Sequence, residues 1–369
     1  FCRGALNALP LLDFQPDVIH AHDWQSGMVP ALLKIQYAHL PFFAGIKTVF
    51  TIHNLQYQGI FGIREVQDVL GLGDSLWTND KLECFGCANY MKAALVYSDV
   101  ITTVSPSYAE EIQTAYYGER LDGLLRARRN DLHGLLNGID VVGYDPATDK
   151  NLYETYDAKH LEGKAVNKAK LQERLGLAVD PDVPLIGMVT RLVSHKGLDL
   201  VKGGVDNIMT YSNAQFVVLG SGDWEYEQFF KEMQAKYPGR FVLCQGFVPE
   251  LARKIYGGSD IFLMPSKSEP CGLSQMIAMR YGTIPVVRET GGLRDTVPPI
   301  NVQTGEGMGF TFQSYNAHDM LDAIDRALAF LSDHDRYTAQ IRKLMKTDFS
   351  WSAAVVRYMA VYLRVTAKQ

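Results

Sequence analysis

Short, continuous runs of apolar residues recur along the chain and alternate with longer segments of helical character. A continuous apolar run is typical of a strand that is buried on both faces of a parallel sheet. Regular alternation of such strands with helices predicts a doubly wound α/β fold. The strands expected in the second half of the chain lie near 184–190, 215–219, 241–244, 260–264 and 284–287.

The first half of the chain repeats this pattern over three further segments. Ser105 followed by Pro106 places a cap residue and a proline at the first helical position, which predicts the start of a helix. The first half is therefore also expected to be α/β. Its expected strands lie at 16–21, 47–53 and 99–104.

A change of composition that begins near residue 137 predicts a domain boundary. The Asn-Gly-Ile-Asp turn at 137–140 is followed by Pro146 and by a polar stretch that ends near Lys159. We therefore expect a first domain over 1–150, a second over 151–345 and a closing helical segment over 346–369. Apolar residues that could bury one face of that closing helix are Ala354, Val355, Tyr358, Val361 and Tyr362.

The turn after the apolar run 260–264 is the strongest candidate for chemistry. It reads P-S-K-S-E-P-C-G-L and places the carboxylate of Glu269 between a buried strand and the helix expected after Leu273. Open α/β sheets bind ligands at the carboxyl ends of their strands, and the first N–H groups of a helix can hold an anion or a hydroxyl. Glu269 is therefore expected to face a ligand.

Two cations follow the expected strand 184–190 in the same way. Arg191 and Lys196 fall just past the strand end, so they could reach the crevice that Glu269 faces. A pair of fixed positive charges in such a crevice suits a diphosphate. Either residue alone is as readily explained as a solvated loop charge.

Several motifs together resemble the bacterial glycogen synthase and plant starch synthase family. They are T-R-L-V-S-H-K-G-L-D-L from Thr190, S-E-P-C-G-L-S-Q from Ser268 and T-G-G-L-R-D-T-V from Thr290. The resemblance extends through nearly the whole chain. It implies the GT-B fold, with two Rossmann-like doubly wound domains that face a cleft. It also implies a retaining transfer of glucose from ADP-glucose to the non-reducing end of an α-1,4-glucan such as glycogen.

The resemblance also implies roles for individual residues. In the first domain, Asp23 and His53 would face the donor glucose, with help from Asn137, whereas His20 is interpreted as a structural histidine. Arg191 and Lys196 would stabilise the departing phosphate, and Glu269 would bind and orient the glucose or stabilise its cationic form. The expected substrate-binding residues of the second domain are Gly220, Phe247 (stacked on adenine), Cys271, Gly272, Leu273, Thr290, Gly291 and Gly292.

The sequence departs from the family pattern at two places. The Lys-x-Gly-Gly-Leu loop with which the family begins is missing, so the chain is expected to be a fragment whose first domain is incomplete. A noncatalytic protein that binds ADP or glucan is therefore the alternative function. Ile277 occupies the position of a second glutamate in the wider group, which puts the ribose contact in doubt.

Composition and charge leave few other classes of function. The chain has 369 residues, 47% of them hydrophobic, which favours two domains with a core each. Its net charge of −5 does not suggest nucleic-acid binding. No apolar run approaches membrane-spanning length. Oligomeric state is not predicted. Five cysteines are an odd and sparse set, which indicates a reducing compartment and a cytoplasmic location.

Three alternative interpretations of single motifs are weighed and set aside. Cys84-Phe-Gly-Cys87 has redox or zinc spacing, but a zinc site needs a second ligand pair and a thioredoxin-like site a different surrounding pattern, so packing thiols are favoured. His20, His22 and Asp23 do not favour a metal site, because Asp23 would point away from the face that the two histidines share. Gly220-Ser-Gly222 lacks the third glycine of a dehydrogenase fingerprint. No metal and no cofactor are expected.

Overall fold

The computed structural model describes residues 1–367 and divides the chain into two compact units. The first unit comprises 1–137 and the chain from Ala354 on, and the second runs from Gly138 to Ala353. The segment that follows Gly138 was expected in the first domain. It belongs to the second unit because the buried Asp149 accepts hydrogen bonds from Arg253 and Tyr281.

The first unit is built on a parallel sheet with the strand order β1-β2-β6-β7. The three strands expected from apolar runs are confirmed to within two residues at each end, whereas β7 was not predicted because it is only three residues long. Parallel register pairs His22 with Thr51 at the ends of β1 and β2. The strands are β1 (Val18–His22), β2 (Lys47–Ile52), β6 (Val100–Thr103) and β7 (Leu132–Gly134).

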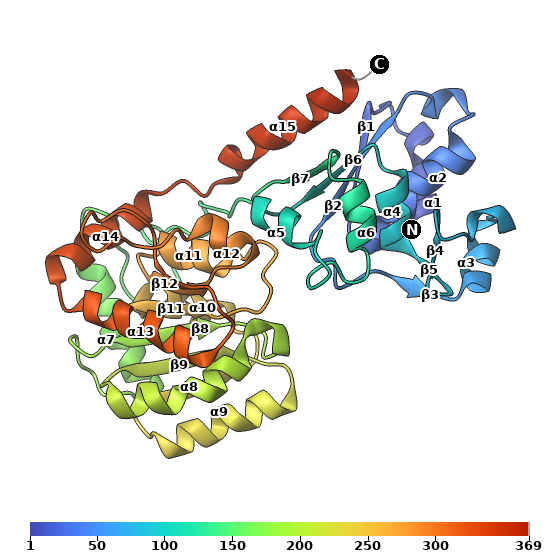
Figure 1. Ribbon diagram of the computed structural model, residues 1–369. Coiled ribbons are helices and arrows are strands. Elements are labelled where there is room, and N and C mark those ends of the chain that lie inside the picture. Colours follow the sequence, from blue (N-terminus) through green and yellow to red (C-terminus); the bar gives the residue numbers. More distant parts are fainter. Residues whose placement is uncertain (368–369) are drawn as a thin grey trace. The chain divides into compact units, whose positions relative to one another are not determined.

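Short helices and a small antiparallel sheet complete the first unit (Figure 1). The predicted helix start at Ser105 is confirmed, because its hydroxyl accepts a hydrogen bond of 3.1 Å from the Tyr108 N–H. The antiparallel sheet has the order β3-β5-β4 and was not predicted. These elements are α1 (Cys2–Ala8), α2 (Met28–Leu32), α3 (Ile63–Leu70), α4 (Tyr90–Tyr97), α5 (Pro106–Glu111), α6 (Asp122–Ala127), β3 (Ile60–Phe61), β4 (Glu83–Cys84) and β5 (Cys87–Asn89).

The closing helix, α15 (Trp351–Ala367), packs on the sheet of the first unit. Tyr358 and Val361 are buried as predicted, whereas the prediction for Val355 is wrong, since 47% of its surface is exposed. The buried residues Tyr358, Val361 and Val365 are spaced at i, i+3 and i+7, so they lie on one face of the helix. The cluster that results contains Val49, Val100, Leu135, Tyr358, Val361 and Val365.

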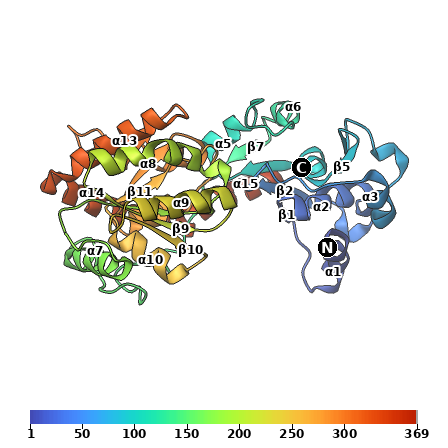
Figure 2. The same ribbon diagram turned by 90° about the horizontal axis from the view of Figure 1, so that it is seen from below.

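The second unit is a six-stranded parallel sheet with helices on both faces. Figure 2 shows α8 and α13 on one side of this sheet and α7 and α10 on the other. The five predicted strands are confirmed, and β13 is an additional short one. The elements are α7 (Glu162–Leu175), β8 (Leu185–Val189), α8 (Leu198–Tyr211), β9 (Gln215–Gly220), α9 (Trp224–Lys236), β10 (Phe241–Gln245), α10 (Pro249–Gly258), β11 (Ile261–Met264), α11 (Ser274–Arg280), β12 (Ile284–Arg288), α12 (Gly291–Thr296), β13 (Phe310–Phe312), α13 (Ala317–Leu331) and α14 (His334–Lys346).

The strand order of the second unit, β10-β9-β8-β11-β12-β13, contains a topological switch point. From β8 the chain proceeds outward through β9 and β10, and it then returns to the other side of β8 with β11. Connections therefore leave β8 and β11 in opposite directions, which opens a crevice at their carboxyl ends. The loops that carry Arg191, Lys196 and Glu269 start at these two strand ends.

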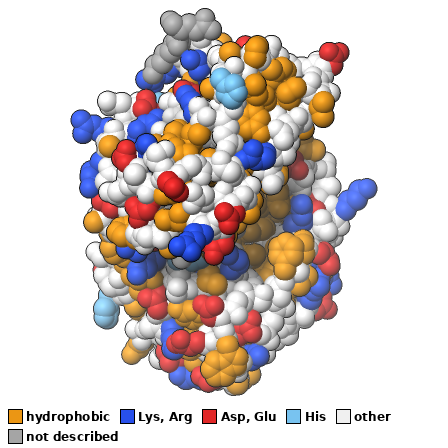
Figure 3. All heavy atoms as spheres, turned by 90° about the vertical axis from the view of Figure 1, so that its right-hand side faces the viewer, with side chains coloured by type: hydrophobic (Ala, Val, Ile, Leu, Met, Phe, Trp, Pro, Cys, Tyr) orange, Lys and Arg blue, Asp and Glu red, His pale blue; other side chains and the backbone are white. Residues whose placement is uncertain are grey.

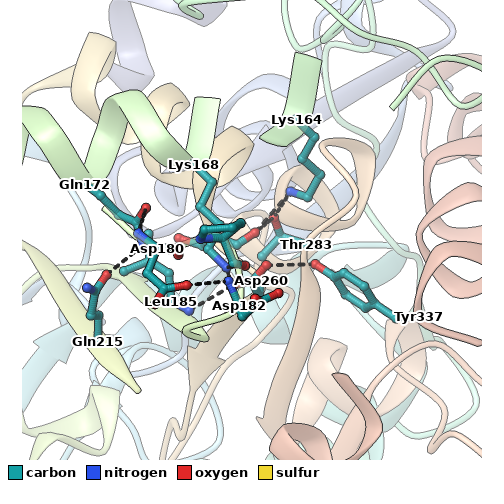
Figure 4. A network of polar contacts seen from close by, with 12 residues as sticks. Lys164, Lys168, Gln172, Asp180, Asp182, Leu185, Gln215, Asp260, Thr283 and Tyr337 are labelled. Carbon is teal, nitrogen blue, oxygen red and sulfur yellow. Dashed lines mark hydrogen bonds and ion pairs between the residues drawn. The ribbon is translucent and has the colours of Figure 1, made fainter. Parts of the chain in front are cut away.

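A buried polar network holds the amino-terminal ends of β8 and β11, at the edge of the sheet away from the cavity (Figure 4). One carboxylate oxygen of Asp260 accepts a hydrogen bond of 2.8 Å from the Leu185 N–H and contacts the Lys168 ammonium at 2.8 Å. Its other oxygen accepts from the Tyr337 hydroxyl at 3.0 Å. Lys164 is also buried and donates to three carbonyls and to the Thr283 hydroxyl. Burial lowers the pKa of Lys164 to about 7. The network fixes the register in which the two strands enter the site.

No helix among residues 1–367 combines the length and the apolar character needed to cross a bilayer.

Candidate functional site

Within the second unit, Glu269 and Lys196 meet at the switch point. The Lys196 ammonium lies 2.7 Å from a carboxylate oxygen of Glu269, and the Ser266 hydroxyl donates to the same oxygen at 3.0 Å. Only 7% of the Glu269 surface is exposed. The two residues are 73 positions apart in the sequence, so the strand order alone brings them together.

A cavity of about 210 Å³ opens beside this ion pair. Its lining includes Arg191, Lys196 and Glu269, which are the three charged residues that the sequence places in one crevice. Gly272 and Leu273 line it as well, so both predicted turn residues border the cavity. Burial of the Glu269 carboxylate and of most of the Lys196 side chain strengthens their electrostatic interactions with a bound ligand, because buried charges are screened less by water.

Close approach of backbone segments explains why the nearby turn is rich in glycine. A Cβ atom on Gly291 would lie 2.1 Å from the carbonyl oxygen of Glu269, and one on Gly292 would lie 2.0 Å from that of Cys271. The Gly292 N–H also donates to the Glu269 carbonyl at 3.0 Å. Gly291 and Gly292 therefore position the backbone of the acidic turn, next to the buried Thr290.

A second cavity of about 210 Å³ lies along the carboxyl ends of β8 and β9. It shares Val189, Thr190 and Arg191 with the lining of the first, and Gly220 and Phe247 border it too. The Phe247 side chain is 92% exposed, so its ring faces are available to a ligand. At Gly220, a Cβ atom would lie 1.9 Å from the Thr190 carbonyl oxygen, which explains the glycine at this strand end.

His195 was not singled out in the sequence although it lies between the two cations. Burial lowers its pKa, and the positive charges of Lys196 and Arg191 lower it further. The imidazole is therefore neutral at pH 7. The sequence T-R-L-V-S-H-K-G could have indicated His195 as a site residue, because a histidine close to two fixed cations loses its proton readily.

Within the first unit, Asp23 and His53 meet at the ends of β1 and β2. A carboxylate oxygen of Asp23 accepts a hydrogen bond of 2.8 Å from the backbone N–H of His53. Asp23 has a φ of 53°, a left-handed conformation that non-glycine residues rarely adopt. Such backbone strain is concentrated at functional sites. No sequence pattern had indicated this conformation.

Three imidazoles lie in a row at this strand end. The His20 and His22 rings stack with centroids 4.1 Å apart, and His22 Nδ1 lies 3.0 Å from His53 Nε2. His20 is held by the Thr51 hydroxyl at 2.6 Å and the Tyr362 hydroxyl at 2.7 Å, so a structural role suits it. Burial, then the neighbouring histidines, lower the pKa of His20 to about 3, and burial followed by His53 lowers that of His22. The sequence had not indicated His22 as a site residue.

The remaining predicted site residues have the following surroundings. Asn137, at the end of the first unit, is half-buried, and its side-chain oxygen has no partner among the described residues. Cys271 is buried in the acidic turn. Ile277 is buried on α11 and does not border either cavity. Within residues 1–367, no three His, Cys, Asp or Glu side chains lie close enough to hold a metal ion.

Charged side chains of both signs are intermingled on the face of the molecule drawn in Figure 3. No extended surface of one sign is visible there.

Two family models match the chain, one over the first unit and one over the second. A family model described as the starch synthase catalytic domain matches residues 1–127, and one described as glycosyl transferases group 1 matches residues 170–344. The loops after β8 and after β11, which line the first cavity, both lie within the second match.

Curated relatives and solved structures agree with these models. The chain is 54% identical to the glycogen synthase of Geobacillus thermodenitrificans (strain NG80-2) over 369 residues, which is 100% of this chain and 76% of that protein. Identity to the glycogen synthase of Geobacillus stearothermophilus is also 54%, with the same coverage.

The catalytic domain of Starch Synthase IV from Arabidopsis thaliana, solved with ADP and acarbose, matches with a TM-score of 0.93 at 36% identity, over 100% of this chain and 76% of that one. Sucrose-phosphate synthase from Thermosynechococcus elongatus, at 19% identity and a TM-score of 0.61, shares the fold alone. The α/β architecture, the GT-B likeness and the matching sequences lead to one assignment: this chain belongs to the glycogen synthase and starch synthase family of glycosyltransferases.

Proposed function

We propose that this protein transfers glucose from ADP-glucose to the non-reducing end of an α-1,4-glucan with retention of configuration. The observation that carries the proposal is the 2.7 Å contact between Lys196 and the enclosed Glu269 in a cavity at the switch point. ADP and acarbose bound to the related Starch Synthase IV support a nucleotide and a glucan-like sugar as ligands.

Arg191 and Lys196 stabilise the diphosphate as it leaves. Breaking the bond between the anomeric carbon and the phosphate oxygen leaves negative charge on that oxygen, and preorganised cations stabilise such charge most where water is excluded. A lysine ammonium has three N–H donors, so its contact with Glu269 leaves donors for phosphate. The N–H groups near Gly272 and Leu273 assist.

Glu269 holds the sugar on the other side of the breaking bond. Its enclosed carboxylate accepts hydrogen bonds from glucose hydroxyls, or it stabilises the positive charge that grows on the sugar ring. Lys196 orients this carboxylate and compensates its buried negative charge, because the two groups are in contact and both are largely buried. The acceptor hydroxyl of the glucan forms the new bond to the anomeric carbon on the face that the diphosphate leaves, and its proton passes to the departing diphosphate oxygen, so no further base is invoked. The donor is a substrate, not a cofactor.

Asp23 and His53 contribute the glucose-binding residues of the first unit. The Asp23 carboxylate fixes the His53 backbone through the hydrogen bond at 2.8 Å, so the His53 carbonyl and imidazole are held in defined positions. The carbonyl then faces the developing positive charge, and the imidazole binds the glucose 6-hydroxyl with help from Asn137. The adenine stacks on Phe247, whose exposed ring borders the second cavity. The cytoplasmic location expected from the cysteine content is part of the same proposal.

The test is glucose incorporation into glycogen from labelled ADP-glucose and UDP-glucose by the full-length protein and its Glu269→Gln variant. We expect transfer from ADP-glucose and a loss of about 10²–10³-fold or more in the variant, because an ionised group at the reacting sugar is removed. Isothermal titration should show that the variant still binds ADP.

Glu225→Gln is the matched control. Glu225 also pairs with a lysine, Lys202 at 2.8 Å, but its side chain is exposed on α9. It should retain full activity. Near-normal transfer by Glu269→Gln would show that the role assigned to Glu269 is wrong. Binding of ADP by the unmodified protein without any transfer would favour a noncatalytic function.

A further inference from the structure

Two cysteines face each other at the tip of the small antiparallel sheet in the first unit. Cys84 ends β4, Cys87 starts β5, and the two are direct partners in the antiparallel register. Phe85 and Gly86 connect them with φ values of 51° and 80°, both left-handed. A two-residue turn with two left-handed residues is the tightest common hairpin connection, so it holds the flanking residues side by side.

The backbone geometry at this position is compatible with a disulfide. Directly opposed residues in an antiparallel pair have Cα atoms about 4.5 or 5.5 Å apart, and disulfides join Cα atoms about 4.4–6.8 Å apart. Opposed side chains also project from the same face of the sheet. We propose that Cys84 and Cys87 form a reversible redox pair that closes into an intramolecular disulfide across the hairpin tip.

The surroundings of the pair leave it accessible and favour a redox role over metal binding. Both cysteines are only half-buried and neither forms a disulfide in the structure, so a small oxidant can reach them. No third metal-ligating side chain completes a cluster with them among residues 1–367. Two thiols alone make an incomplete zinc site.

A low-molecular-weight disulfide such as glutathione disulfide is the required oxidant. The thiolate of one cysteine attacks it, which forms a mixed disulfide and releases one glutathione thiolate. The second cysteine then attacks the protein-bound sulfur and releases the second glutathione. Two protein thiols are oxidised, one disulfide bond forms and one breaks, and the two protons end on the two glutathione molecules. Excess reduced glutathione reverses both steps.

The hairpin connects the pair to the segment that follows His53. Strand β5 pairs with β3, and the Asn89 amide donates to the Gln58 side chain at 2.6 Å. Gln58 in turn donates to the Glu119 carbonyl at 2.8 Å, and the Arg120 guanidinium lies 3.5 Å from the centre of the Phe85 ring. A closed tip therefore restrains three neighbouring segments of the first unit.

The test is a titration of the folded protein with mixtures of reduced and oxidised glutathione, followed by alkylation under denaturing conditions and peptide mass analysis. Trypsin cleaves after Lys81 and Lys92, so one peptide carries Cys84 and Cys87 and none of the other three cysteines. We expect this peptide to lose the mass of two hydrogen atoms and to escape alkylation under oxidising ratios. Added dithiothreitol should restore both alkylated thiols.

Two variants control for other outcomes. In Cys84→Ser, Cys87 has no partner and should either be alkylated or carry one glutathione, and it should oxidise only at a higher proportion of oxidised glutathione. Cys244→Ser removes a thiol outside the hairpin and should leave the pair unchanged. If the peptide with both cysteines instead carries two glutathiones, or two alkyl groups at every ratio, the proposal is wrong.

Discussion

The strand ends of the two units carry different chemistry on the same architecture. In the second unit, the cavity beside β8 and β11 contains a buried carboxylate, a lysine 2.7 Å away and an arginine. In the first unit, the ends of β1 and β2 carry stacked imidazoles with lowered pKa values and one aspartate that accepts from a backbone N–H. One site is built around a buried ion pair, and the other around imidazoles and a carboxylate that is bonded to the backbone.

This difference shows how the same parallel-sheet frame can be adapted to ligand groups of different chemistry. Fixed cations in an enclosed cavity suit a diphosphate, because the charge of the ligand replaces the lost solvation. Imidazoles and a strained turn suit sugar hydroxyls, which need oriented donors and acceptors. The sheet supplies the same frame in both units, so the loops after the strands determine the chemistry.

The largest effect should follow from the loss of the Lys196 charge. We expect Lys196→Met to lower kcat/KM by about 10²–10³-fold, because a cation that stabilises the leaving diphosphate is removed. It should also lower the free energy of unfolding, since Glu269 is left buried without its cationic partner. Steady-state transfer assays and urea unfolding measure the two effects.

Lys202→Met is the matched control for this prediction. Lys202 pairs with Glu225 at 2.8 Å, but both side chains are exposed, and neither residue borders a cavity described above. Surface ion pairs contribute about 0–1 kcal/mol, so little should change. If both variants lose the same small amount of activity, the Lys196 charge has no special role, and the difference drawn between the two sites is wrong.

A smaller effect is expected from Phe247→Ala. Its ring is exposed at the border of the second cavity, so truncation should weaken ADP binding by about 1–3 kcal/mol, as for aromatic stacking on other bases, without a loss of stability. Isothermal titration with ADP and with inorganic diphosphate would measure it. Diphosphate affinity should stay unchanged. An equal loss for both ligands would mean that Phe247 acts on the charged part of the site.

The smallest effect concerns pH and the first unit. Burial holds the pKa of His20 at about 3, below its ordinary value of 6.5, so the unfolded chain binds a proton in this interval that the folded protein does not. Stability is therefore complete above pH 6.5 and falls as the pH falls from 6.5 toward 3. The expected loss between pH 7 and pH 5 is about 2 kcal/mol.

His20→Asn sharpens this prediction, because it removes the titrating group. The variant should be less stable at pH 7, since the contacts to Thr51 and Tyr362 are altered, but its stability should depend less on pH. His39→Asn changes an exposed histidine and should leave the pH profile as it is. Urea unfolding at pH 5, 6 and 7 measures all three proteins. An unchanged slope in His20→Asn would assign the pH dependence to other groups.

Local patterns in the sequence determined much of the fold. Continuous apolar runs located five strands of the second unit and three of the first, because a strand buried on both faces needs apolar residues throughout its length. Ser105 marked a helix start, since a capping hydroxyl acts within three residues. The short strands β7 and β13 and the sheet β3-β5-β4 escaped prediction, because two or three residues carry no periodic signal.

Only the tertiary structure decided which distant residues meet. The sequence placed Lys196 and Glu269 after separate strands, but their 2.7 Å contact depends on β8 lying next to β11. Register between β1 and β2 likewise brings His22 to His53, and the left-handed conformation of Asp23 turns its carboxylate to the His53 N–H. Strand order and register arise from contacts across the whole sheet, whereas a motif reports only on its own neighbours in the chain.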